Sequence, residues 1–234
     1  MDSLLVLTIA SAAAGVFALW RFVLVQAHRM YPWFATYLAA SALQSFGWLA
    51  GGTHDRGYLL FYAYTMPLLF GLRIMVVIEL WHRLMPAYQS VESISRPFAW
   101  IVLVLAVGVS AASGLDSLHF LGVSPQRVAY YCISLALRYS SSSLCVICSC
   151  LSLFALLFPR NIPPNALRHA FLLTAYFATI AAGFLAMHYV TGSAPLVGAL
   201  MTGSAAGLYV LWGVLVSGPG ERAPANLAAI PQAG

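Results

Sequence analysis

The sequence predicts an all-α protein that crosses a membrane as a bundle of seven helices. Hydrophobic residues make up 62% of its 234 positions and charged residues 7%, whereas a soluble domain has about 25% charged residues. Seven continuous apolar stretches approach or exceed the roughly 20 residues that a helix needs to cross the hydrocarbon core. Continuous runs indicate helices, because membrane β-barrels give alternating segments of about ten residues. The predicted spans are 4–25, 33–50, 57–82, 97–115, 129–158, 169–190 and 195–217.

The distribution of arginines between the loops predicts how this bundle is oriented. One side has only Arg56 and Arg127. Because cytoplasmic loops are enriched in basic residues, the N-terminus is predicted to lie outside and the C-terminus in the cytoplasm. The predicted cytoplasmic side carries Arg29, Arg83, Arg96, Arg160, Arg168 and Arg222.

The spans leave little of the chain for any other domain. We expect the first span to be retained rather than cleaved as a secretory signal, because Asp2 precedes it and no basic residue does. Residues 1–217 are therefore predicted to form one seven-helix transmembrane domain. Residues 218–234 are rich in Pro, Gly and Ala and are predicted to form a disordered cytoplasmic tail. No output domain is expected.

Polar and aromatic residues recur on one face of the second span. Their spacing is helical, so they share one side of the helix. The residues are Tyr37, Ser41, Gln44 or Ser45, and Trp48.

The third span carries Tyr58 and Tyr62 in its outer half, followed by Pro67, Arg73 and Glu79. Proline removes a backbone donor inside a helix, so a kink is expected near Pro67.

The fifth span carries a polar stripe and all four cysteines. Serine and cysteine let neighbouring helices approach closely, and serine hydroxyls can bond carbonyls of their own helix. A structural metal site needs about four ligands, and no second cysteine pair accompanies the two in the stripe. We therefore interpret the cysteines as packing residues and predict no metal site. The stripe consists of Tyr131, Ser134, Arg138, Ser141, Cys145, Cys148 and Ser152.

The last two spans have small-residue faces that permit close helix contact. Gly183 lies on such a face of the sixth span, and Gly203 and Gly207 form a small-xxx-small pair in the seventh. We interpret them as packing within one bundle rather than as a homodimer interface.

Glu79 is the only acidic residue inside the predicted spans. An intramembrane carboxylate suggests a functional site by default. Arg83, however, follows at i+4 on the same helix, and Arg21 of the first span is predicted at a similar depth. We therefore interpret Glu79, Arg83 and Arg21 as a structural ion-pair group, with a proton-relay or coupling role for the carboxylate as the alternative.

Two arginines within the spans have no such acidic neighbour, and they suggest a ligand site. Arg138 either reaches the outer headgroups or lies within the outer half of the bilayer, and both possibilities remain open. A buried guanidinium faces water, a carbonyl or a bound anion. We hypothesise an outward-facing pocket between the second, third and fifth spans, where Arg138 anchors a carboxylate, phosphate or lipid headgroup. The predicted ligand-binding residues are Arg138, Tyr131, Ser134, Gln44, Trp48, Tyr58, Tyr62 and Arg73.

Together these features favour a non-enzymatic receptor-like or accessory membrane module. A small solute transporter is the alternative, weakened because no repeat or pair of broken helices is visible, and an intramembrane enzyme comes third. The expected partners are membrane lipids, a small anionic ligand and a second membrane protein that carries any signal output. The expected location is the bacterial inner (plasma) membrane.

Composition also excludes two classes of partner. The basic residues are scattered rather than clustered, so no nucleic acid is expected. Covalently bound retinal is excluded because its Schiff base needs a lysine, and the 11 basic residues counted as Lys plus Arg are all arginine. No cofactor is predicted.

Overall fold

The computed structural model describes residues 3–51, 56–84, 125–157, 162–190 and 194–217, together with Trp100 and Val104. Within these residues the regular secondary structure is helical, without strands. The elements are α1 (Ser3–Leu24), the short 3₁₀ helix η1 (Ala27–Arg29), α2 (Pro32–Gly51), α3 (Arg56–Leu84), α5 (Pro125–Leu157), α6 (Pro164–Tyr189) and α7 (Ala194–Leu215).

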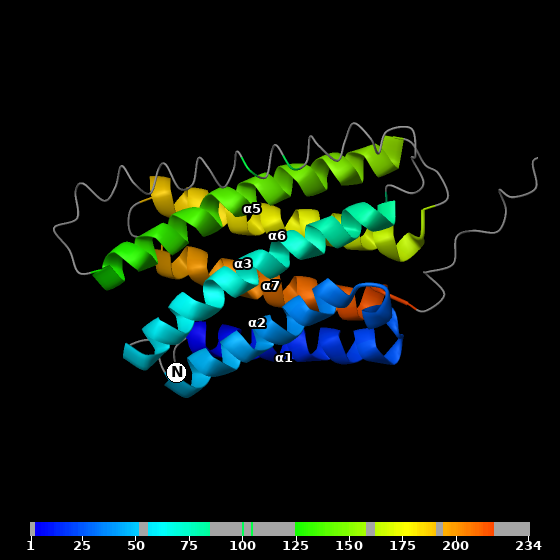
Figure 1. The fold of residues 1–234 in the computed structure, drawn as a ribbon. Helices are drawn as coiled ribbons and strands as arrows, with labels where there is room; N and C mark the ends of the chain where they lie inside the picture. The colour runs from blue at the N-terminus through cyan, green and yellow to red at the C-terminus, as the bar shows by residue number, and fades with distance from the viewer. Residues whose placement is uncertain are drawn as a thin grey trace, which may run out of the picture.

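The six long described helices lie side by side in one elongated bundle (Figure 1). Contacts join them in a ring in the order α1, α2, α3, α5, α6, α7 and back to α1, and α3 also contacts α6 across the ring. α1, α3, α5 and α7 run from left to right in Figure 1, while α2 and α6 run back. We call the left end, where α1 begins, the N end, and the right end, where α1 and α7 finish, the C end.

Five of these helices are long and apolar enough to cross a membrane, as the composition predicts for a multi-pass membrane protein. α2 is not among them, because polar residues along it lower its hydropathy. The fourth predicted span, 97–115, lies outside the described residues apart from Trp100 and Val104, as does the predicted tail 218–234. The count of seven spans and the orientation therefore stay predictions. The five segments are Leu5–Leu24, Tyr64–Leu84, Leu135–Leu157, Pro164–Met187 and Pro195–Leu215.

The sixth helix begins earlier than hydropathy predicted. The predicted span starts at residue 169, whereas α6 starts at Pro164. Proline suits a first helical turn, where its missing N–H is not needed. The added turn contains the polar residues Asn165 and Arg168, so it does not belong to the continuous apolar stretch that predicts the span.

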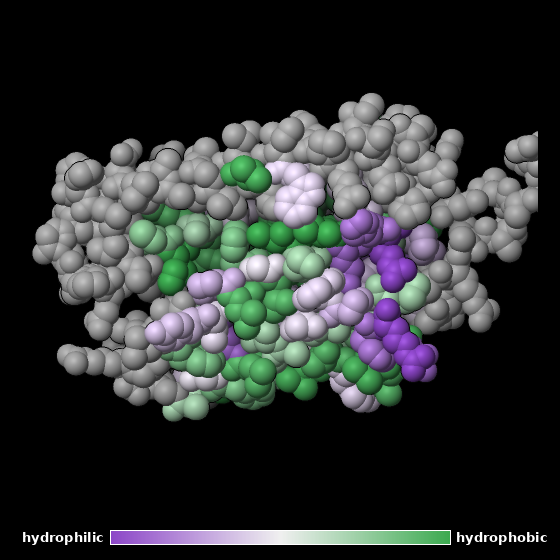
Figure 2. Space-filling view, viewed as in Figure 1, coloured by the Kyte–Doolittle hydropathy of each residue, from purple (hydrophilic) through white to green (hydrophobic). Residues whose placement is uncertain are grey.

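An aromatic core fills the half of the bundle nearest the C end. The ring of Phe34 lies 4.5 Å from that of His169, 4.7 Å from that of Trp212 and 5.2 Å from that of Phe22, measured between centroids. Trp212 Nε1 donates a hydrogen bond of 3.0 Å to His169 Nδ1. Figure 2 shows apolar side chains along the middle of the described surface, with strongly hydrophilic ones gathered at the C end.

α1 and α7 pack closely because α7 presents glycine to α1. A Cβ added to Gly213 would lie 2.6 Å from Phe17, closer than two carbons can approach. A Cβ added to Gly203 would lie 3.6 Å from Leu7, whereas one added to Gly207 would meet no atom of another helix within 4 Å. One member of the predicted small pair therefore serves packing within the bundle.

Candidate functional site

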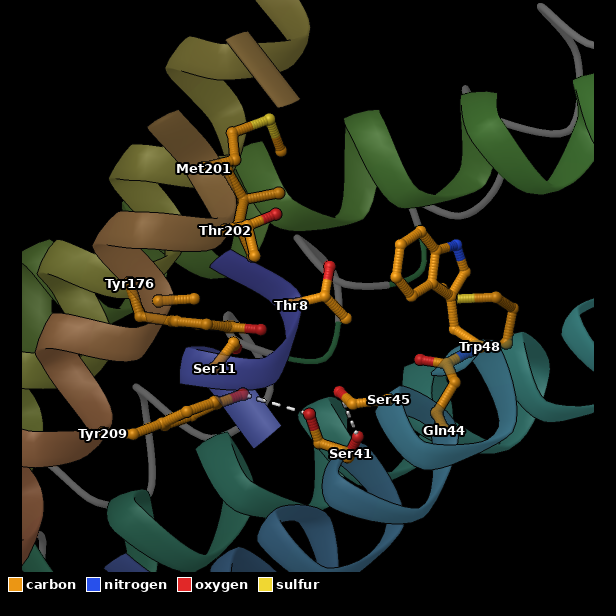
Figure 3. A pocket seen from close by; sticks show the side chains of 13 residues that line it. Thr8, Ser11, Ser41, Gln44, Ser45, Trp48, Tyr176, Met201, Thr202 and Tyr209 are labelled. Carbon is orange, nitrogen blue, oxygen red and sulfur yellow. Dashed lines mark hydrogen bonds between the residues drawn. The ribbon is translucent and has the colours of Figure 1, made fainter. Parts of the chain in front are cut away.

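A cavity of about 330 Å³ opens among α1, α2, α3, α6 and α7 (Figure 3). It lies nearer the N end than the C end, because Thr8 and Ser11 are in the first half of α1 and Gln44 and Trp48 are in the second half of α2. Nine of its 13 lining residues carry a polar group. Two phenols, Tyr176 and Tyr209, and the indole of Trp48 contribute to its wall. The other polar lining residues are Thr8, Ser11, Ser41, Gln44, Ser45 and Thr202.

The floor of the cavity is formed by buried side chains from α6 and α7. Tyr176 is 5% exposed and Tyr209 3% exposed, whereas the lining residues of α1 and α2 are partly exposed. In Figure 3 the hydroxyl ends of both tyrosines point toward the α1 and α2 side chains. A ligand that reached the floor would therefore meet phenol oxygens.

The hydroxyl groups at the floor form a continuous hydrogen-bonded chain. Tyr176 and Tyr37 are hydrogen-bonded through their hydroxyls. The Tyr37 hydroxyl lies 3.4 Å from that of Tyr209, which in turn lies 3.2 Å from Ser41 Oγ. Because Tyr37 is not a lining residue, the chain passes behind the wall and returns to the cavity.

Arg73 of α3 stands at the far end of this chain. Its Nη2 donates a hydrogen bond of 3.3 Å to the Tyr176 hydroxyl. The guanidinium carbon lies 5.7 Å from the ring centre of Tyr176 and 5.9 Å from that of Tyr37, within the range of cation–π contact. Arg73 Nε is buried without a hydrogen-bond partner. The charged guanidinium of Arg73 is thus separated from the cavity by the side chain of Tyr176.

The rim carries an amide with spare hydrogen-bonding capacity. Gln44 Nε2 donates to Thr65 Oγ1 at 3.1 Å, which uses one of its two amide hydrogens. Ser45 Oγ donates to the carbonyl of Ser41 at 3.0 Å, so its oxygen can still accept. Together with the phenols, these groups can both donate to and accept from a ligand.

The structure brings together only part of the predicted ligand-binding set. Gln44 and Trp48 line the cavity, and Arg73 lies behind it. Arg138 is not a lining residue; its guanidinium carbon lies 5.6 Å from the ring centre of the adjacent Tyr139. Its role as an anchor stays a prediction. The side chains of Tyr58, Tyr62, Tyr131 and Ser134 lie outside the described residues.

Sequence reasoning missed the two floor tyrosines and the contribution of α1. Tyr176 and Tyr209 lie well inside apolar helices, whereas tyrosine in membrane helices is enriched at the interfaces. That displacement from the interface was the available signal. Thr8 and Ser11 gave none, because isolated hydroxyls in a span usually bond their own helix.

Glu79 caps the beginning of α2. Its two carboxylate oxygens accept hydrogen bonds from the backbone N–H groups of Trp33, at 3.0 Å, and Phe34, at 3.1 Å. The first N–H groups of a helix have no partner within it, and a negative charge at this end is favourable. Glu79 is 7% exposed, and it satisfies backbone groups that the membrane would leave unpaired.

The two arginines predicted beside Glu79 also hold backbone groups. Arg83 donates twice to the carbonyl of Met30, from Nε at 3.1 Å and from Nη2 at 2.7 Å. Arg21 Nε donates to the carbonyl of Gly213 at 3.0 Å. The three predicted partners thus hold chain segments at the C end, and their direct ion pairing stays a prediction.

The end of α7 is held in the same way by α6. Arg168 Nη1 donates to the carbonyl of Leu215 at 2.7 Å. Asn165 Nδ2 donates to the carbonyl of Ser217 at 2.7 Å, and Asn165 Oδ1 accepts from the Ser217 N–H at 3.3 Å. These bonds satisfy carbonyls that a helix end leaves open.

The serine run of α5 bonds mainly to its own backbone. Ser140, Ser142 and Ser143 donate to the carbonyls of Leu137, Arg138 and Tyr139. Ser152 Oγ lies 3.1 Å from Thr174 Oγ1 and links α5 to α6. Within the described residues, no group of three or more His, Cys, Asp or Glu side chains is placed to hold a metal ion.

No protein-family model, curated protein or solved structure matches this chain. The chemistry of the cavity must therefore be judged from its own residues. Among the described residues its lining contains no acid, histidine or cysteine. It offers hydrogen bonds, one aromatic wall and a nearby positive charge.

Proposed function

We propose that this protein is a membrane-embedded binding module that takes a small hydrogen-bonding molecule or a lipid headgroup into the cavity among α1, α2, α3, α6 and α7. The observation that carries the proposal is the concentration of hydroxyl and amide groups around a space of about 330 Å³. Ligand pockets in proteins begin at about this size. A space of this kind fits a headgroup or a small metabolite.

Polar lining inside a membrane protein favours ligands that replace water's hydrogen bonds. A buried donor or acceptor without a partner destabilises a protein by about 1 to 3 kcal/mol. A ligand that lacks the matching groups is therefore rejected more strongly than one that differs by a methylene. The lining of Ser41, Gln44 and Tyr209 gives the cavity this selectivity.

Binding rather than catalysis is supported by the lack of a carboxylate, imidazole or thiol in the described lining. In this proposal the occupied state is read by a second membrane protein that packs against the bundle, and surrounding lipids provide the solvent. The predicted orientation places the N end, and with it the cavity, in the outer half of the membrane.

The test combines native mass spectrometry with paired variants of α2. Ser45 and Thr36 each donate a hydroxyl to the carbonyl four residues earlier, at 3.0 Å and 2.8 Å, but only Ser45 lines the cavity. Gln44→Leu and Ser45→Ala should reduce the amount of a co-purified small molecule or lipid. Thr36→Ala should not. Equal retention by all three variants would reject the cavity as the binding site.

Transport of the same ligand is the competing function. Protein reconstituted into liposomes would then accumulate a labelled form of the retained molecule. A binding module gives saturable binding without uptake, so uptake that Gln44→Leu abolishes would replace the proposed function with transport.

A further inference from the structure

We propose that the cavity selects ligands that carry an anionic group, a carboxylate or a phosphate, and that Arg73 supplies the attraction through the phenol of Tyr176. This inference rests on the proposed binding function and specifies, in addition, that the ligand is negatively charged. It moves the anion-binding role from Arg138, which the sequence favoured, to Arg73.

The charge on Arg73 lacks a protein counter-ion in the described part of the chain. Glu79 is the only acidic residue among the described positions, and its two oxygens are held by the N–H groups of Trp33 and Phe34. A guanidinium within a membrane span is unfavourable unless an anion, water or carbonyl balances it. A bound anion provides that balance.

The hydrogen-bonded chain leaves a donor at the cavity wall, so the cavity prefers a ligand that accepts hydrogen bonds. A guanidinium only donates, so Arg73 fixes the Tyr176 oxygen as an acceptor. Tyr176, Tyr37, Tyr209 and Ser41 supply four hydroxyl hydrogens, and the links between them use three. One hydrogen remains for an acceptor outside the chain. When each hydroxyl donates to the next in the order Tyr176, Tyr37, Tyr209, Ser41, the remaining hydrogen is that of Ser41, which lines the cavity, and it is available to a ligand.

The positive charge of Arg73 can attract a bound anion even though the Tyr176 side chain lies between them. Charge–charge attraction falls only inversely with distance, and it is several times stronger at a protein interior's effective dielectric than in water. Hydrogen bonds in a chain also polarise one another. The remaining hydroxyl at the end of the chain is therefore a stronger donor than an isolated hydroxyl would be.

A purely structural role for Arg73 makes a different prediction. The guanidinium lies near the rings of both Tyr37 and Tyr176, and such contacts alone hold an arginine in place. In that case removal of the charge would lower stability without changing which ligands bind. The two roles are separated by measuring ligand preference rather than stability alone.

The experiment uses three probes with the same three-carbon frame: glycerol 3-phosphate, glycerate and neutral glycerol. The full chain is placed in phosphatidylcholine nanodiscs, and each probe is titrated by calorimetry. We expect the two anions to bind at least about ten-fold more tightly than glycerol. Arg73→Gln should remove that preference, and Arg73→Lys should restore part of it. Arg29→Gln, at an exposed arginine of the C end, should leave the preference unchanged.

A second variant keeps the test valid if Arg73→Gln does not fold. Tyr176→Phe retains the ring but removes the hydroxyl that accepts from Arg73 Nη2, so it should also lower the anion preference at least about five-fold. The unmodified protein is informative as well, because equal binding of glycerol and its charged analogues would already overturn the inference. Arg138→Gln is the competing substitution. If it, and not Arg73→Gln, removed the preference, Arg73 would not be the residue responsible.

The source of the anion is determined in a separate arm. Native mass spectrometry of nanodiscs with and without phosphatidic acid shows whether a phosphate-bearing lipid is retained. Retention that Arg73→Gln abolishes assigns a lipid headgroup, whereas binding of glycerol 3-phosphate alone assigns a soluble ligand. Saturable glycerol binding that Gln44→Leu removes, without any anion preference, would preserve the proposed function and reject this inference. If neither probes nor lipids bind, both proposals fail.

Discussion

The C end and the cavity use polar side chains in opposite ways. At the C end, Glu79 and Arg83 bond to backbone N–H and carbonyl groups of other segments. Around the cavity, Tyr176, Tyr37 and Tyr209 bond to one another's hydroxyls, and Arg73 donates to the first of them. One region uses charge to hold the chain, and the other gathers donors around a space.

The difference follows from where each residue meets its neighbouring helices. A helix end leaves about four N–H or carbonyl groups without partners, so polar side chains nearby form hydrogen bonds with these backbone groups. In mid-helix those groups are already paired within the helix. A polar side chain there must find another side chain, water or a ligand. In membrane proteins, the type of partner therefore helps separate structural charges from functional ones.

Glu79→Gln should give the largest loss of stability, because it weakens the cap of α2. A neutral amide has one acceptor oxygen, so one of the two N–H groups now bound would lose its partner. We expect a loss of about 3 kcal/mol in the free energy of unfolding, measured by thermal unfolding in one detergent. Affinity for glycerol 3-phosphate should not change below the unfolding temperature. A stable variant that had lost binding would make Glu79 part of the functional site.

Arg83→Gln should have an intermediate effect, because it breaks two donations to one carbonyl, that of Met30. Hydrogen bonds from charged donors contribute about 1.5 to 3 kcal/mol, and Arg83 is partly exposed, so we expect a loss of about 1.5 kcal/mol. Arg29→Gln, at an exposed arginine of the same end, is the matched control and should change unfolding little. Equal melting temperatures for the two variants would remove Arg83 from the structural group.

Most of the described bundle could be predicted from the sequence because it depends on apolar length. The five segments that can span a membrane coincide with predicted spans, apart from their ends. The early start of α6 could not be found in this way, because the turn with Asn165 and Arg168 is polar. The role of this turn appears only when Ser217 and Leu215 of α7 lie beside it.

The candidate site was less predictable, because it depends on which helices are neighbours. The polar face of α2 was visible from spacing, and Gln44 and Trp48 do line the cavity. The sequence grouped that face with the third and fifth spans, however, whereas contacts place α2 between α1 and α3. The order of helices around a bundle depends on how all of their surfaces pack together. The residue pattern of one span does not show which helices will be its neighbours.

Gly183→Ala should weaken binding more than stability. A Cβ at Gly183 would lie 2.3 Å from Met201 Sδ, and Met201 lines the cavity. The flexible methionine can move, so overpacking should cost only about 1 kcal/mol of unfolding free energy. The displaced side chain enters the cavity or shifts its wall. Gly198→Ala, where no atom lies within 4 Å, is the control and should alter neither quantity. Unchanged probe affinity in Gly183→Ala would show that this wall does not contact the ligand.

Ser41→Ala should have the smallest effect on stability and the most specific effect on binding. Ser41 is partly exposed and ends the hydroxyl chain through its contact with Tyr209, so its loss should lower the unfolding free energy by less than about 1 kcal/mol. The unused hydrogen then passes to Tyr209, deeper in the floor. Affinity for glycerol 3-phosphate should fall about five-fold, the equivalent of one hydrogen bond. The preference for glycerol 3-phosphate over glycerol should persist, because Arg73 and Tyr176 are unchanged. Calorimetry with both probes tests this, and a preference that disappeared with Ser41 would assign it to the serine rather than to Arg73.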